Sequence, residues 1–238
     1  MQRSSAREPF HFSKWYLDCV SAEGEAFLAY CAELRWRALR LHYASLLGHS
    51  SSLRQAPEPV WRDGVLEWDA PDLGVSGRWE ALDPPIEATL LDGDCQWQCL
   101  APRARVDLRV GDRSVRGLGY AEHLTMTVAP WNLEIDELRW GRFLSETDGL
   151  VWIELRGPKP ANLRWHNGVP CGEEVELALR DPVVLRDGAL AETALAIVPN
   201  LLKMFPSRIL GLCETKWRSR AALGGTEGWA IHEIVKWA

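Results

Sequence analysis

The sequence has none of the short motifs that mark the common catalytic and nucleotide-binding sites. It contains no GxSxG, no HExxH and no GxxxxGK followed by Ser or Thr, so a hydrolase triad, a zincin metal site and a phosphate-binding loop have no support. Gly117-x-Gly119 is not a dinucleotide loop, because no third glycine follows at the required spacing. The six histidines never place two on one face of an expected strand. We therefore expect no metal site and no cofactor.

Cysteine spacing argues against both zinc and disulfides. The six cysteines include no CxxC pair. Cys95 and Cys99 are four residues apart on an expected strand, about 13 Å along it, which is too far for a disulfide. Cys19 and Cys31 flank an expected hairpin, but its turn pairs Cys19 with Phe27 instead of with Cys31. We expect free thiols that are mostly buried.

An excess of positive charge and a long hydrophobic run are also missing. The net charge of -6 does not favour nucleic acid or an anionic membrane as a partner. No apolar run approaches the roughly 18 residues of a membrane-spanning helix, and residues 1–12 lack the apolar core of a secretory signal. We expect a cytoplasmic protein without an integral membrane segment, and its oligomeric state stays open.

What the sequence has in excess is tryptophan and short strand-like segments. The 13 Trp outnumber the 4 Tyr and 5 Phe together, and such rings need a broad interior or an apolar ligand. Turn residues recur about every ten residues between these segments, which predicts an all-β antiparallel barrel or sandwich. One short helix is expected within 194–205, where Pro199 interrupts it.

A weak internal echo predicts two halves. Trp15 and Trp140 each open an expected hairpin, and Gly119-Tyr120-Ala121 is echoed by Gly228-Trp229-Ala230. We expect an N-terminal half over residues 1–129 and a C-terminal half over residues 130–238.

The most informative candidate for a site is Glu122. If 119–128 is extended, Tyr120, Glu122 and Leu124 share one face. A carboxylate in this apolar row is costly unless it is paired, protonated or in contact with a water-filled cavity. Two interpretations follow. Glu122 forms a buried pair with Arg142, or it faces a ligand cavity as a general acid with Tyr120 beside it.

Other expected strands place further candidate ligand-binding side chains in apolar rows. The last strand repeats the pattern of a carboxylate among apolar residues, which makes its glutamate a rival acid. These side chains are Cys95 and Trp97 on one strand, Trp140 and Arg142 on a second, and Trp229 and Glu233 on the last.

Four segments carry a family resemblance: KWYLDCVSAEGEAFLAY (14–30), GLGYAE (117–122), LRWGRF (138–143) and GWAIHEIVKW (228–237). They resemble the hydroxyneurosporene synthase (carotenoid 1,2-hydratase) superfamily of lipocalin-like proteins, including its AttH-like members. The resemblance implies two calycin-like β-barrel halves around an apolar cavity. It also implies, for the hydratase members, protonation of a polyene double bond followed by capture of the cation by water.

The resemblance suggests where a proton donor lies. In the hydratases, a Tyr-x-Asp strand carries the donor and a His-x-Trp strand helps to line the site. Tyr120-Ala121-Glu122 matches the first motif with Glu for Asp, and Cys95-Gln96-Trp97 is the nearest match to the second with Cys for His. The cavity and the position of the acid therefore carry over, but the substrate does not.

Two main functions remain open at this point. The first is a cofactor-independent lyase or isomerase that hydrates, cyclises or isomerises a hydrophobic unsaturated molecule, isoprenoid or polyketide-like, by acid catalysis. The alternative is a non-catalytic lipocalin-like carrier of an apolar ligand. A carbohydrate-binding surface of exposed tryptophans is a third interpretation, with less support because most tryptophans alternate with apolar neighbours.

Overall fold

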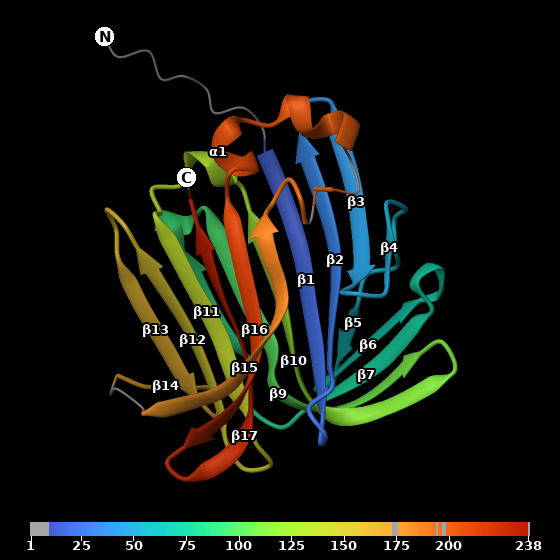
Figure 1. Cartoon of the computed structure of the whole chain (residues 1–238), viewed down its shortest axis with the longest axis vertical. Helices are drawn as coiled ribbons and strands as arrows, with labels where there is room; N and C mark the ends of the chain where they lie inside the picture. Colours follow the sequence, from blue (N-terminus) through green and yellow to red (C-terminus); the bar gives the residue numbers. More distant parts are fainter. Residues whose placement is uncertain (1–9, 173–175, 194, 197–198, 238) are drawn as a thin grey trace.

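The chain folds into two antiparallel β-sheets that share a hydrophobic core (Figure 1). The computed structural model describes residues 10–172, 176–193, 195–196 and 199–237. The first sheet has ten strands and takes up the N-terminal part of the chain. They are β1 (Phe10–Ser21), β2 (Ala26–Trp36), β3 (Leu39–Leu46), β4 (Ser50–Ser52), β5 (Val60–Arg62), β6 (Val65–Ala70), β7 (Val75–Ala81), β8 (Ile86–Leu90), β9 (Cys95–Val110) and β10 (Arg113–Met126).

The second sheet has seven strands. They are β11 (Glu137–Leu144), β12 (Gly149–Arg156), β13 (Ala161–His166), β14 (Val169–Pro170), β15 (Leu177–Ala189), β16 (Cys213–Leu223) and β17 (Thr226–Lys236). Short helical turns connect the strands: η1 (Pro71–Leu73), η2 (Leu91–Gly93), η3 (Pro130–Asn132), η4 (Pro199–Met204) and α1 (Ser207–Leu210).

The two sheets repeat one strand order. The centre of the first reads β2-β1-β10-β9, and the centre of the second reads β12-β11-β17-β16. In each half, the first strand of the N-terminal hairpin pairs with the last strand of that half: β1 with β10, and β11 with β17. This repeat supports the proposed division near residues 129 and 130, which falls between β10 and β11 and stays a prediction.

The predicted all-β lipocalin-like fold class is confirmed. Within the described residues both sheets are open, because β4 and β5 end the first and β14 and β15 end the second without pairing with each other. The predicted hairpin is also confirmed, with Cys19 opposite Phe27 in the β1–β2 register. All six cysteines are free thiols, four of them buried.

The helix predicted within 194–205 is replaced by two shorter pieces. The 3₁₀ turn η4 begins at Pro199, whose fixed φ and missing N–H suit the first turn of a helix. The single α-helix among the described residues, α1, begins just beyond the predicted stretch. Residues 194, 197 and 198 of that stretch lie outside the described ranges.

A buried ion pair joins the two sheets at their central strands. Arg142 on β11 donates from Nε and Nη2 to the two carboxylate oxygens of Asp18 on β1, at 3.1 and 2.7 Å. Its Nη1 donates to the Trp229 carbonyl oxygen at 2.9 Å, and the Tyr16 hydroxyl donates to Asp18 at 3.0 Å. Neither charged side chain has any exposed surface. Each charge therefore depends on the other, because a lone buried charge is strongly unfavourable.

We expect Asp18→Asn to lower the free energy of unfolding by about 3–5 kcal/mol, because it leaves the Arg142 guanidinium buried without its counter-charge. Urea unfolding followed by circular dichroism measures the change. Glu25→Gln is the matched control, since it breaks the exposed ion pair with Arg113 and should have a much smaller effect. Equal effects of the two substitutions would contradict the structural role of the buried pair.

A second prediction concerns His232 on β17, whose ring stacks on Trp217 and whose Nε2 lies 3.0 Å from Ser219 Oγ. Burial lowers the pKa of His232 to about 4. Between pH values of about 6.5 and 4, His232 is therefore protonated in the unfolded chain but neutral in the folded chain. Because the unfolded state binds one proton more, the free energy of unfolding falls as pH drops through this range. His232→Gln should flatten this part of the urea-midpoint profile, whereas His49→Gln, at an exposed position, should not. Parallel profiles for wild type and His232→Gln would contradict the assignment.

Candidate active site

An apolar cavity of about 380 Å³ lies between the two sheets. Its walls come from β1, β2, β9 and β10 on one side and from β11, β15, β16 and β17 on the other. Most of the lining is aliphatic and aromatic, which is typical of a site for a small hydrophobic molecule. The charged side chains that line it are Lys14, Glu122, Arg186, Glu214, Lys216 and Glu233.

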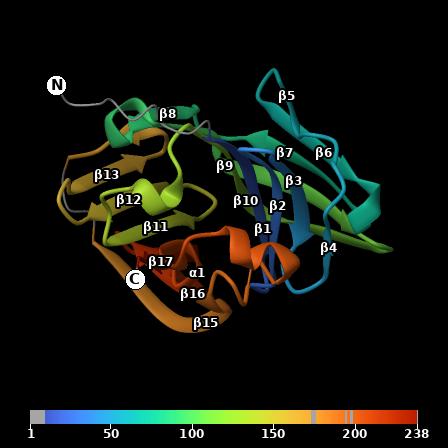
Figure 2. The ribbon, with the colours of Figure 1, turned by 90° about the horizontal axis from the view of Figure 1, so that it is seen from above.

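The segment that contains η4 and α1 covers one end of this cavity. Figure 1 shows it in orange beside the start of β1, and from above it lies between the blue strands of the first sheet and the red strands of the second (Figure 2). Phe205 and Ile209 from this segment line the cavity, as does Trp131 of η3. Trp131 and Phe205 both pack against Trp36, with ring centroids 4.7 and 5.7 Å away. These three rings cover this end of the cavity.

Glu122 on β10 is held inside the cavity wall by two neutral donors. Its Oε2 accepts hydrogen bonds from the Tyr120 hydroxyl and from Trp97 Nε1, each at 2.6 Å. The side chain is 5% exposed, and its other oxygen, Oε1, accepts no hydrogen bond from the described residues. Because Glu122 lines the cavity, a molecule bound there can contact its carboxyl group.

The strand around Glu122 is shaped by close backbone approach. The β9–β10 register shifts between Gly119 and Glu122. A Cβ atom at Gly119 would lie 2.1 Å from the carbonyl oxygen of Asp18, so only glycine fits there. The alternation predicted for this strand is confirmed, since Glu122, Leu124 and Met126 all line the cavity.

The predicted pair between Glu122 and Arg142 is wrong. Arg142 is bonded to Asp18 and to the Trp229 carbonyl, and no cationic side chain among the described residues lies within 4 Å of the Glu122 carboxylate. In the β1–β10 register Asp18 lies opposite Tyr120, whereas Glu122 lies opposite Tyr16, one step further along. Arg142 therefore binds β1 at Asp18, which lies opposite Tyr120 and two residues along the strand from the position opposite Glu122.

Tyr120 and Cys95 lie where they were predicted and stay protonated. Burial, followed by the charges of Cys99 and Glu122, raises the pKa of Tyr120 well above its ordinary value, so its hydroxyl is a donor to Glu122. Cys95 lines the cavity near Trp97, and burial raises the pKa of its thiol to about 12. It is a neutral wall residue.

Glu233, the rival acid, faces the same cavity from β17. It lies opposite Lys216 in the β16–β17 register, and their charged atoms are 2.5 Å apart. Burial lowers the pKa of Lys216, but the charges of Glu233, Tyr30 and Glu214 outweigh it and raise that pKa overall. Burial raises the pKa of Glu233, and the Lys216 charge outweighs it and lowers that pKa overall. Glu233 is therefore an ion-paired carboxylate, in contrast to Glu122.

Trp140 forms part of the cavity wall between the two glutamates. Its ring packs edge-on against Tyr16 and Tyr120, with centroids 5.2 and 5.4 Å apart, and Trp140 lies opposite Glu233 in the β11–β17 register. Trp97 packs on Trp165 at 5.1 Å. The predicted aromatic lining around Glu122 is thus present.

The cavity also contains residues that the sequence did not single out, namely Lys14, Tyr30, Arg186, Glu214 and Lys216. Glu214 and Lys216 alternate along a strand with neutral residues between them, a pattern that also describes a solvent-exposed face. The one sequence signal that could have placed Glu214 and Lys216 in the cavity was Glu233, an acidic residue in an apolar row on the neighbouring strand.

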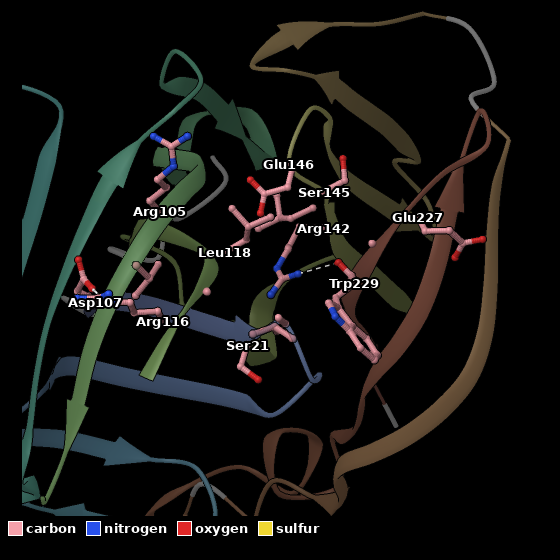
Figure 3. A pocket seen from close by; sticks show the side chains of 16 residues that line it. Ser21, Arg105, Asp107, Arg116, Leu118, Arg142, Ser145, Glu146, Glu227 and Trp229 are labelled. Carbon is pink, nitrogen blue, oxygen red and sulfur yellow. Dashed lines mark hydrogen bonds and ion pairs between the residues drawn. The ribbon is translucent and has the colours of Figure 1, made fainter. Parts of the chain in front are cut away.

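Arg142 and Trp229 do not line the cavity that holds Glu122. They line a second, open pocket of about 520 Å³ beyond the Asp18 ion pair (Figure 3). Trp229 contacts Arg218 and Arg220 with its ring, at 4.8 and 5.2 Å from their guanidinium carbons. Trp229 and Glu233 lie on the same face of β17, but they are four residues apart, which is about 13 Å along a strand. Trp229 therefore lines the second pocket and not the cavity of Glu233.

The residues that the structure describes contain neither an arranged metal-binding group nor a membrane-spanning helix. No group of three or more His, Cys, Asp or Glu side chains is arranged to hold a metal ion. No helix there is both long and apolar enough to cross a membrane.

No known family model and no curated protein sequence matches the chain. Solved structures do match. CghA in its structure with Sch210972 is 11% identical with a TM-score of 0.54, and the match covers 95% of this chain and 88% of CghA. A Nitrosomonas europaea protein assigned as AttH is 8% identical at 0.52, covering 96% and 92%. Kievitone hydratase from Nectria haematococca is 9% identical at 0.51, covering 96% and 89%.

At these identities the similarity shows the fold alone. It agrees with the all-β lipocalin-like fold class, although within the described residues neither sheet closes into the barrel that the resemblance implied. The specific likeness to hydroxyneurosporene synthase stays a resemblance.

We expect Leu124→Trp to fill the cavity and to weaken binding of the neutral apolar probe N-phenyl-1-naphthylamine by at least about tenfold, because the added indole occupies the space of the ligand. A fluorescence titration measures the affinity. Val169→Trp, which adds an indole at a position that is 59% exposed, is the control and should bind the probe as wild type does. Equal binding by wild type and Leu124→Trp would mean that the probe site lies elsewhere.

Proposed function

We propose that the protein is a cofactor-independent lyase or isomerase that uses Glu122 to transfer a proton to and from a hydrophobic unsaturated small molecule held between the two sheets. The observation that carries the proposal is the environment of Glu122. This carboxyl group is buried in an apolar cavity, is bonded on one oxygen to two neutral donors, and has no cationic partner among the described residues. Such a carboxyl group is suited to general acid–base catalysis.

In this proposal the reaction begins with protonation of a carbon–carbon double bond. Glu122 gives its proton from Oε1 to one alkene carbon, the π electrons form the new C–H bond, and the adjacent carbon becomes cationic. Addition of water and return of one of its protons to Glu122 completes a hydration. Loss of a neighbouring proton to the Glu122 carboxylate completes an isomerisation. Attack by a second double bond closes a ring and moves the positive charge to a carbon of that bond, and loss of a proton from there to the Glu122 carboxylate completes a cyclisation.

The rings around Glu122 stabilise the cation in this scheme. Trp97 and Trp140 present aromatic surface to the cavity. A cation held against such a face gains up to about 2 kcal/mol when water is excluded. The cover formed by Trp131 and Phe205 excludes bulk water, so that only a water molecule admitted with the substrate competes for the cation.

Proteins of the same fold give the proposal its plausibility. Kievitone hydratase is by its name a hydratase, and CghA has a structure with the compound Sch210972. A cavity protein of this shape that lacks the proton transfer would be a carrier of apolar ligands. The environment of Glu122 favours the enzyme, because a carrier has no need of a buried carboxyl group without a cationic partner among the described residues.

The test is Glu122→Gln, whose amide oxygen can still accept from Tyr120 and Trp97 while its amide nitrogen cannot donate a proton to carbon. We expect turnover to fall by at least about 100-fold with unchanged thermal stability. Prenylated phenols and conjugated polyenes incubated in D₂O, with products followed by mass spectrometry for added water, added deuterium or changed retention, provide the readout.

Glu87→Gln removes an exposed carboxylate on β8 and serves as the matched control, which should keep full turnover. If Glu122→Gln turns substrate over as fast as wild type, Glu122 is not the proton-transfer group. If neither protein changes any compound but both bind them, the carrier function is favoured.

A further inference from the structure

Two hydrogen-bond donors buried in the wall of the cavity have no partner within the part of the chain that the structure describes. The Tyr30 hydroxyl and Trp140 Nε1 both belong to residues that line the cavity, and neither atom has a hydrogen-bond partner among the described residues. Tyr30 is 7% exposed and Trp140 is 5% exposed. An unsatisfied buried donor costs about 1–3 kcal/mol, so two of them in one cavity call for an external partner.

Both donors flank the same aromatic ring. Tyr16 lies between them, with its centroid 5.4 Å from Tyr30 and 5.2 Å from Trp140. Lys216 Nζ lies above all three rings, at 4.9 Å from Tyr16 and 5.6 Å from each of the other two. We call this arrangement of Tyr30, Trp140 and Lys216 the donor subsite.

The groups of the donor subsite can donate hydrogen bonds to a ligand. Trp140 Nε1 and the Lys216 ammonium group have no acceptor capacity. Burial raises the pKa of Tyr30 above its ordinary value although Lys216 and Arg186 act to lower it, so the hydroxyl keeps its proton. The complementary ligand atom is therefore an acceptor, and oxygen is the acceptor that such donors bind best.

The charges nearby are balanced, which favours a neutral acceptor. Lys216 pairs with Glu233 at 2.5 Å and approaches Glu214 at 3.7 Å, and Arg186 pairs with Glu214 at 3.4 Å. Around the donor subsite, the two basic side chains Arg186 and Lys216 are thus matched by the two acidic side chains Glu214 and Glu233. A carboxylate ligand would add an uncompensated charge to this set, whereas a carbonyl oxygen would not.

We propose that the donor subsite binds the carbonyl oxygen of the substrate, which makes the substrate a hydrophobic unsaturated ketone, aldehyde or ester. The ring of Trp140 is 5.4 Å from the ring of Tyr120, which holds Glu122, so a molecule bound through its carbonyl extends its unsaturated part toward that carboxyl group. This inference takes from the proposed function only that the cavity is the ligand site.

The experiment compares two fluorescent probes that differ in a carbonyl group: prodan, a naphthylamine that carries a propionyl group, and 2-dimethylaminonaphthalene, which lacks it. Prodan emission also reports hydrogen bonds to its carbonyl oxygen. We expect Tyr30→Phe to weaken prodan binding about 2–10-fold, to shift its bound emission to shorter wavelength, and to leave the carbonyl-free probe within about twofold.

Tyr43→Phe, which removes a hydroxyl from another tyrosine in the cavity lining, is the matched control and should affect neither probe. Tyr30→Phe should also leave the ligand-free protein as stable as wild type, because the hydroxyl that it removes has no partner. Wild-type protein that binds prodan no better than the carbonyl-free probe overturns the proposal. Equal losses for both probes in Tyr30→Phe, or a destabilised ligand-free variant, overturn it as well.

The outcome is independent of catalysis by Glu122. Glu122→Gln should bind prodan as wild type does, since the donor subsite is unchanged. A failed turnover experiment with Glu122 thus leaves a carbonyl preference standing, and a failed probe experiment leaves the role of Glu122 intact.

Discussion

Asp18 and Arg142 come from the central strands of the two sheets and meet through two hydrogen bonds without any exposed surface. Because a charge cannot be left alone in this interior, the pair fixes which residues of the second sheet face which residues of the first. It also separates two pockets. On one side lies the open pocket lined by Trp229, and on the other lies the apolar cavity of Glu122. The ion pair satisfies the arginine, and Glu122 has no cationic partner among the residues that the structure describes.

The cavity then holds two glutamates with different chemistry. Glu233 is paired with Lys216 across neighbouring strands, and the Lys216 charge outweighs burial and lowers the pKa of Glu233. Glu122 receives only neutral hydrogen bonds from Tyr120 and Trp97. Glu233 and its neighbouring cation form a polar end of the cavity, and Glu122 is the group to which we assign the proposed proton transfer. The difference arises from partners on adjacent strands, not from the depth of burial.

Much of this arrangement could be predicted from local patterns. Alternation along β10 was enough to place Glu122 and Leu124 on the cavity face, and turn chemistry was enough to give the Cys19–Phe27 register. The partner of Arg142 could not be predicted, because Asp18 lies 124 residues away on the other sheet and no strand pattern records how two sheets are offset. The donor subsite was missed for the same reason. Its members come from β2, β11 and β16, and they become a set only when both sheets are in place.

The central claim is that the space between the sheets holds a hydrophobic, unsaturated molecule against Glu122. Native mass spectrometry of the purified protein, with extraction and identification of whatever small molecule accompanies it, tests this most directly when wild type and Leu124→Trp are compared. The account predicts an apolar unsaturated molecule with a carbonyl group in wild type and none in the variant. A ligand that stays bound in Leu124→Trp, or a wild-type protein that is empty and takes up nothing from a lipid extract, would contradict it.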